Sequence, residues 1–139
     1  MKIEDFFNQN NIIDLSFFNF SNAITACYFA KENLEILKVN KNFLSFFPIL
    51  GNVNNAYFPD VLEQIGLPGN QIEEFIHDIN EKGTVLIPEI LIKINDKERV
   101  FSLLSTRTKD ESFTYLNGVQ GQFVDRTAEF NLRKERQNL

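Results

Sequence analysis

The chain has no tryptophan, one cysteine and one histidine among its 139 residues. The single cysteine, Cys27, excludes an intramolecular disulfide and any metal site built from several cysteines, and it suits a reducing compartment. No nucleophile elbow, glycine-rich phosphate loop or cluster of metal ligands is present in the sequence. We therefore expect no catalytic residues, no metal and a protein that is not an enzyme.

The chain also lacks a long apolar run and an excess of positive charge. No stretch approaches the roughly 18–20 apolar residues of a membrane span. Glu4 and Asp5 interrupt the start, where a signal peptide would be apolar. The net charge of −5 argues against nucleic acid and anionic membranes as partners. We expect a cytoplasmic protein, or the cytoplasmic part of a larger receptor, with no membrane contact by this segment.

Phenylalanine is abundant. Fifteen Phe and a hydrophobic content of 43% predict a globular core, and the length predicts one folded unit. Residues 1–20 are expected to form an N-terminal helical extension, because Phe6 and Phe7 begin an apolar stripe of helical spacing. Residues 21–126 are expected to form the core domain, and residues 127–139 a linker helix.

The first half of the core domain favours two strands and then short helices. Strands are predicted in residues 23–30 and 34–39. Asn40 then caps a short helix that runs through Phe47. Residues 52–69 contain proline and glycine between apolar residues, which favours short helical turns.

The second half favours one long helix and three antiparallel strands. The helix covers residues 70–82 and ends at Gly83. The strands are expected in residues 84–95, 99–107 and 113–124. Pro88 removes one ladder donor, so we expect an edge position or a bulge nearby. Residues of one parity in the first of these strands are all apolar and should share a face: Leu86, Pro88, Ile90, Ile92 and Ile94.

The residue pattern near the end of the chain changes from that of a strand to that of a helix at residues 125–127. Residues 113–124 alternate as in a half-buried strand, whereas the residues after Ala128 are rich in helix formers. Asp125 or Thr127 can each accept a hydrogen bond from the N–H groups that open a helix. The last strand should therefore run directly into a charged helix, and a helix this short needs a packing partner.

The order of these elements resembles a PAS domain, over about residues 16–132. The resemblance rests on four points: Asn40 with Phe43 three residues later, Gly83 before the next strand, Gly121, and Asp125-Arg126-Thr127. It implies an α+β fold with a five-stranded antiparallel sheet, short helices on one face, an N-terminal helical extension and a C-terminal exit helix. At Arg126 the family usually has an aliphatic residue.

The resemblance also implies a function. It implies a non-catalytic sensory or dimerisation module of a bacterial signal-transduction protein, such as a two-component system. The signal would pass through Asp125 and Thr127 to a covalently linked output domain: a histidine kinase, a nucleotide or diguanylate cyclase, or a chemoreceptor. A homodimer is expected, and Ala128, Leu132 and Leu139 can start a coiled-coil seam.

Two other functions stay open. The first is a protein-interaction domain that binds no ligand. The second is a small enzyme of similar curved-sheet fold, for which Glu89 is the carboxylate to examine, because such an enzyme would need a strongly perturbed acid.

A ligand, if one binds, is expected to be an apolar or aromatic small molecule between the long helix and the sheet. Fifteen Phe can fill that space completely or line a cavity, so both remain open. Thr25, Tyr28 and Ser102 are the possible polar contacts. The candidate lining residues are Thr25, Tyr28, Ile72, Phe75, Ile76, Ile79, Ile90, Ile92, Phe101, Leu103 and Phe123.

Haem and LOV-type flavin chemistry are not expected. Haem-binding members of the family can use a histidine of the long helix, but His77 lies roughly 150° from the apolar face at about 100° per residue. The light-sensing LOV branch uses a cysteine in an Asn-Cys-Arg-Phe motif, which this chain lacks, and Phe123 replaces its flavin-contacting glutamine. Cys27 is expected to be a small core or pocket residue. A flavin held in another arrangement stays open.

Overall fold

The computed structural model describes residues 25–108 and 117–137, with residues 135–137 described by their backbone alone. The predicted helical extension in residues 1–20 and the start of the last strand in residues 113–116 lie outside these ranges. Within the described ranges, no helix is long and apolar enough to cross a membrane.

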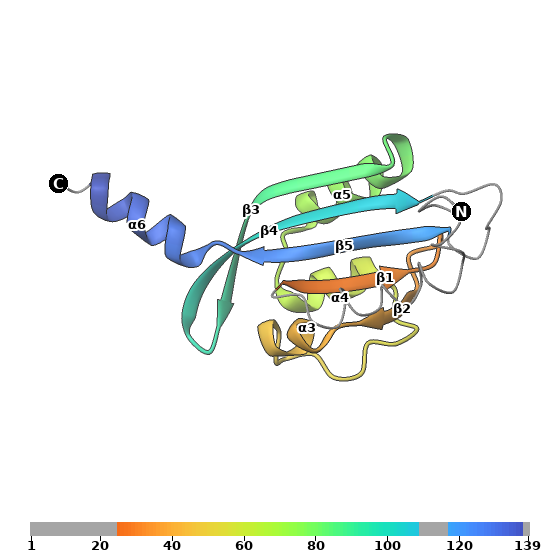
Figure 1. The fold of residues 1–139 in the computed structure, drawn as a ribbon, viewed down its shortest axis with the longest axis horizontal. Coiled ribbons are helices and arrows are strands. Elements are labelled where there is room, and N and C mark those ends of the chain that lie inside the picture. Colours follow the sequence, from red (N-terminus) through yellow and green to blue (C-terminus); the bar gives the residue numbers. More distant parts are fainter. Residues whose placement is uncertain (1–24, 109–116, 138–139) are drawn as a thin grey trace, which may run out of the picture.

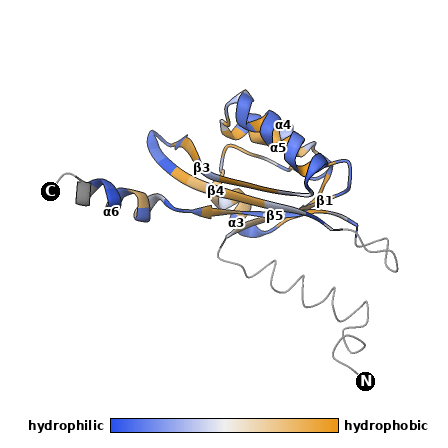
Figure 2. Ribbon diagram, turned by 90° about the horizontal axis from the view of Figure 1, so that it is seen from above, coloured by the Kyte–Doolittle hydropathy of each residue, from blue (hydrophilic) through white to orange (hydrophobic). Residues whose placement is uncertain are grey.

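Five strands form one antiparallel sheet, as predicted, and their order in the sheet is β2-β1-β5-β4-β3 (Figure 1). The strands are β1 (Ala26–Ala30), β2 (Ile36–Val39), β3 (Thr84–Ile94), β4 (Lys97–Thr108) and β5 (Gly118–Asp125). The helices are α3 (Lys41–Phe46), α4 (Phe58–Ile65), α5 (Gly69–Glu81) and α6 (Thr127–Gln137). Figure 2 shows α4 and α5 against one face of the sheet. Helix α6 leaves the end of β5 and projects away from the sheet.

Two residues predicted from the sequence to start or end a helix do so in the structure. The Asn40 side-chain oxygen accepts from the Phe43 N–H at 3.1 Å and so caps α3. Gly83 follows Lys82, the C-cap residue of α5, and has a positive φ of 75°, a conformation that glycine adopts at no steric cost. The segment predicted as short helical turns contains one regular helix of eight residues, α4.

Strand β3 carries both features predicted from Pro88, an edge position and a bulge. Its register with β4 shifts between Ile87 and Ile90. The prediction of one apolar face for Leu86 and Ile90 is wrong, because the extra residue of the bulge reverses the parity. Leu86 is 60% exposed, whereas Val85 and Ile87 are buried before the bulge and Ile90 after it.

The core between the sheet and the helices is aromatic. Seven aromatic side chains are among the largest that are fully buried: Tyr28, Phe43, Phe47, Phe58, Phe75, Phe101 and Phe123. Phe58 stacks on Tyr28 at 3.9 Å between ring centroids, and the other rings meet mostly edge-on or tilted. Such pairs add stability beyond the area that they bury.

Candidate functional site

The structure brings most of the predicted lining residues together in this aromatic core. Eight of them are at most 3% exposed: Tyr28, Phe75, Ile79, Ile90, Ile92, Phe101, Leu103 and Phe123. Ile72 and Ile76 are partly buried and pack against the same cluster. Phe123 lies 4.9 Å from Phe47 and 6.4 Å from Phe58, between ring centroids. The chain's own rings therefore occupy the space in which a ligand was expected.

One polar group of the core is Tyr28. Its hydroxyl shares a short hydrogen bond with the Ser105 hydroxyl, and burial raises the pKa of Tyr28 although that bond opposes the shift. The ring crosses over Gly121, where a Cβ would lie 2.7 Å from a Tyr28 ring carbon and 2.3 Å from Ser105 Oγ. Gly121 therefore makes room for this contact.

The other two predicted polar contacts lie on the opposite side of the sheet. Thr25 donates its hydroxyl to the Gln122 side-chain oxygen at 2.9 Å, and Gln122 pairs with Cys27 across the strands. Ser102 alternates with the inward-facing Phe101 and donates to the Pro88 carbonyl oxygen. Because side chains alternate along a strand, neither residue reaches the space between the sheet and the helices.

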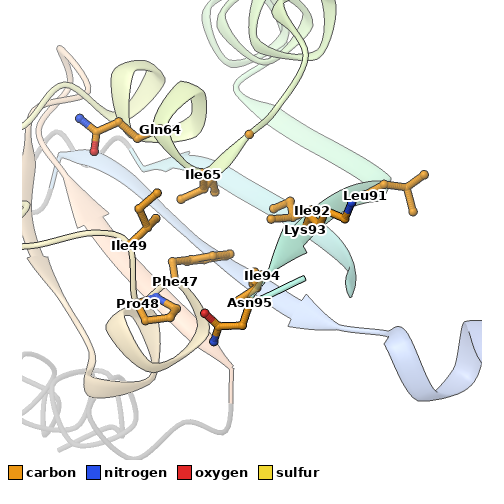
Figure 3. A pocket seen from close by; sticks show the side chains of 11 residues that line it. Phe47, Pro48, Ile49, Gln64, Ile65, Leu91, Ile92, Lys93, Ile94 and Asn95 are labelled. Atoms are coloured by element: carbon orange, nitrogen blue, oxygen red, sulfur yellow. The ribbon is translucent and has the colours of Figure 1, made fainter. Parts of the chain in front are cut away.

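A groove of about 710 Å³ opens beside the core, between the helices and the far end of β3 (Figure 3). Phe47, Ile49 and Ile65 lie on one side of it, and Ile92 and Ile94 on the other. Its volume is in the range of small-molecule sites. Of the predicted lining residues, only Ile92 belongs to the groove.

The two residues considered for cofactor chemistry, His77 and Cys27, both lie outside the aromatic core. The prediction that His77 points to solvent is confirmed, since its side chain is 68% exposed. Cys27 was expected to be a small core or pocket residue. It is instead partly buried on the face of the sheet opposite Tyr28, outside the aromatic core. Among the described residues, no group of three His, Cys, Asp or Glu could hold a metal ion.

Glu89, the carboxylate considered for an enzyme, is an exposed residue of the bulge. The enzyme alternative required a carboxylate shielded from solvent. The hypothesis of a buried carboxylate at this position is therefore wrong.

The junction between β5 and α6 is built from polar contacts. Asp125 accepts the Thr127 N–H at 2.9 Å, so it opens the helix as predicted, and it forms an ion pair with Arg99 of β4. Burial acts to raise the pKa of Asp125, but hydrogen bonds from Thr127 and Arg99 outweigh it and hold the pKa below its ordinary value.

Thr127 joins the helix to β4. Its hydroxyl oxygen accepts the Val100 N–H at 2.9 Å, and the Arg126 N–H donates to the Val100 carbonyl oxygen at 2.8 Å. Both backbone groups of one β4 residue thus hold the start of α6.

Arg126 makes contacts that an aliphatic residue cannot make. Its guanidinium donates to both carboxylate oxygens of Glu129, at 2.6 and 3.0 Å, and to the Ser102 hydroxyl at 3.3 Å. This network was not predicted from the sequence, although the three-residue spacing from Arg126 to Glu129 is a recognisable helical pair.

Comparison with known proteins identifies the fold. No family model and no curated protein matches the chain. The PAS domain of BvgS from Bordetella pertussis is 15% identical, with 93% of this chain and 99% of that chain covered and a TM-score of 0.62. The PAS domain of a Colwellia psychrerythraea protein is 16% identical, with 84% and 98% covered and a TM-score of 0.57. The LOV domain of the Erythrobacter litoralis EL346 blue-light-activated histidine kinase is 14% identical, with 76% and 99% covered and a TM-score of 0.57.

The chain therefore has the fold of a PAS domain. The five antiparallel strands, the helices on one face of the sheet and the exit helix agree with the architecture that the sequence resemblance implied.

Proposed function

We propose that this chain is a non-catalytic sensory or dimerisation module that relays a signal through α6 to an output domain. The observation that carries this proposal is the junction, where the central strand β5 continues directly into a projecting helix. Similar folds occur in the PAS domain of a two-component sensor histidine kinase and in a light-activated histidine kinase. We further propose a cytoplasmic location for this chain, with residues 1–20, 21–126 and 127–139 as extension, core and relay helix.

The mechanism is a shift of the sheet that biases two arrangements of α6. Asp125 and Thr127 carry the shift, because they tie the start of α6 to Arg99 and Val100 of β4. A ligand or partner changes the populations only if it binds one arrangement more tightly than the other. Leu132 is 50% exposed on α6, which supports a homodimer packed through this helix.

The structure indicates less about the signal that the domain would receive than about the helix that would pass it on. The filled aromatic core favours a domain that dimerises and transmits, whereas the groove beside it is the space for an apolar or aromatic small molecule. No haem or LOV-type flavin is part of this proposal.

Native mass spectrometry of the purified chain, with an absorbance spectrum of the same sample, tests the proposal. A dimer supports it, and a retained mass would name the class of ligand. Hydrogen exchange of the α6 amides then compares the wild type with a D125A/T127A variant. Faster exchange in α6 with an unchanged core supports the relay, whereas a monomer whose α6 exchange does not respond contradicts it.

A protein-interaction domain is the second candidate, and the groove favours it. Ile49 is 77% exposed at the rim and Leu91 is exposed opposite, so the groove offers apolar surface to a partner. A bare monomer in the mass spectrum would favour this function over the first.

A further inference from the structure

The bulge of β3 is fastened by a side chain of the neighbouring strand. The register shifts between Ile87 and Ile90, so Pro88 and Glu89 together oppose Ser102. The buried Ser102 hydroxyl donates to the Pro88 carbonyl oxygen at 2.7 Å. A hydroxyl has one proton and two lone pairs, so the Ser102 oxygen can still accept a hydrogen bond.

Arg126 supplies that hydrogen bond. Its Nη1 donates to Ser102 Oγ at 3.3 Å, while Nε and Nη2 hold both carboxylate oxygens of Glu129 in the first turn of α6. The planar fork of arginine presents separate N–H donors to the two partners in a fixed geometry. The Arg126 side chain therefore spans the distance from the bulge to the exit helix.

The bulge is also tied to the helical layer. Gln71 of α5 donates its side-chain N–H to the Glu89 carbonyl oxygen at 3.2 Å. Hydrogen bonds thus run from α5 through the bulge and Ser102 to Arg126 and α6.

The site has room for a second arrangement. A hollow of about 390 Å³ lies beside the guanidinium, between the bulge and α6, and Pro88, Val100 and Phe130 help to line it. Arg126 is partly exposed there, so its side chain can leave Ser102 without displacing core residues.

We propose that Arg126 is a positioning residue that couples the β3 bulge to α6 through Ser102. This proposal rests on the proposed function and names a second route into the same helix, separate from Asp125 and Thr127. A movement of α5 or of the edge strand at the bulge shifts Ser102, and Arg126 passes the shift to the first turn of α6.

Hydrogen exchange on the whole purified chain tests the coupling. P88A perturbs the bulge and is made in the wild-type, S102A and R126M backgrounds. We expect P88A to speed the exchange of the first α6 amides about five-fold in the wild type, at the lower end of common coupling energies. In S102A or R126M the same change should alter their exchange less than two-fold. S102T, which keeps the hydroxyl, should restore the response.

The controls separate coupling from general loosening. T106A removes a hydroxyl from the same face of β4 away from the bulge, and it should leave the response to P88A intact. Protection of the α5 and central β4 amides must be retained in every variant compared. An equal response to P88A with and without Arg126, or no response in the wild type, would overturn the proposal.

This result is independent of the relay experiment. If D125A/T127A leaves α6 exchange unchanged while the response to P88A persists, the proposed relay through Asp125 and Thr127 fails and the Arg126 coupling stands. If D125A/T127A instead speeds α6 exchange while P88A has no effect in the wild type, the coupling through Arg126 fails and the relay through Asp125 and Thr127 stands.

Discussion

The aromatic core and the α6 junction are held together in different ways. In the core, rings from the sheet and the helices fill the space. The single ring of Phe123, for example, contacts those of Phe43, Phe47, Phe58 and Phe101. At the junction, the structure depends on a few directed contacts of partly exposed groups, such as Asp125 with Thr127.

The difference separates the residues that hold the fold together from those that we propose relay a signal. Burial of apolar area is non-directional and large in sum, so the core fixes the fold. Each polar contact at a partly exposed site contributes little, which leaves α6 free to change its position while the core stays folded. Mutations in the two regions should therefore differ in both size and kind of effect.

Removal of one core ring should have the largest effect. F123A is expected to lower the free energy of unfolding by about 3–5 kcal/mol, because a cavity forms among four other rings. Urea unfolding followed by circular dichroism measures the loss. I49A, at an exposed rim position, is the control and should change it by less than about 0.5 kcal/mol. A similar loss in both variants would show that the rings are not the source of stability.

Overpacking at Gly121 should have the next largest effect. A Cβ there would lie 2.6 Å from the Leu104 carbonyl oxygen and still closer to Ser105 Oγ. G121A is therefore expected to cost about 1–3 kcal/mol in thermal or urea unfolding. G51A is the matched control, since a Cβ at Gly51 meets nothing within 4 Å. Equal stabilities of the two variants would contradict the close approach of Tyr28 to β5.

The sequence predicted the parts of the fold that depend on local chemistry. Asn40 as a cap, Gly83 as a stop and a bulge near Pro88 follow from the conformations and donors of those residues alone. The sequence could not predict on which face of the sheet Leu86 lies, because the position at which a bulge inserts its extra residue depends on the partner strand.

The candidate site was harder to predict for the same reason. The ion pair of Arg99 with Asp125 joins residues 26 positions apart, and the Arg126 contact to Ser102 spans 24. Such contacts exist only once the strands have their register, so periodicity cannot show them. The inward residues of the long helix were predictable, because their 3.6-residue period is a property of the helix itself.

The junction should respond to pH in a way that the core does not. At neutral pH, D125N is expected to cost about 0.5–1 kcal/mol of stability, because asparagine can still accept the Thr127 N–H but lacks the charge that pairs with Arg99. The folded pKa of Asp125 lies below its ordinary value. The stability from its charge is therefore complete above the unfolded pKa of about 3.9, and it is lost as pH falls through the folded pKa.

Urea unfolding of both proteins from pH 7 down to pH 2 checks this prediction. The difference between wild type and D125N should shrink toward zero at the acid end. A difference that stays constant over the whole range would mean that the carboxylate charge does not stabilise the junction. F123A should show no comparable convergence with the wild type, because no titrating group changes.

The smallest effect is expected at His77, which belongs to neither region. Its imidazole contacts Asp78 from an exposed position on α5, and Asp78 keeps its ion pair with Lys82 when the ring is removed. H77A should change the free energy of unfolding by less than about 0.5 kcal/mol, as exposed substitutions do. Because the ring points away from the core, the purified protein should show no Soret band. A Soret band that disappears in H77A would place a haem on the outer face of α5 and would contradict the expectation that the chain binds no haem.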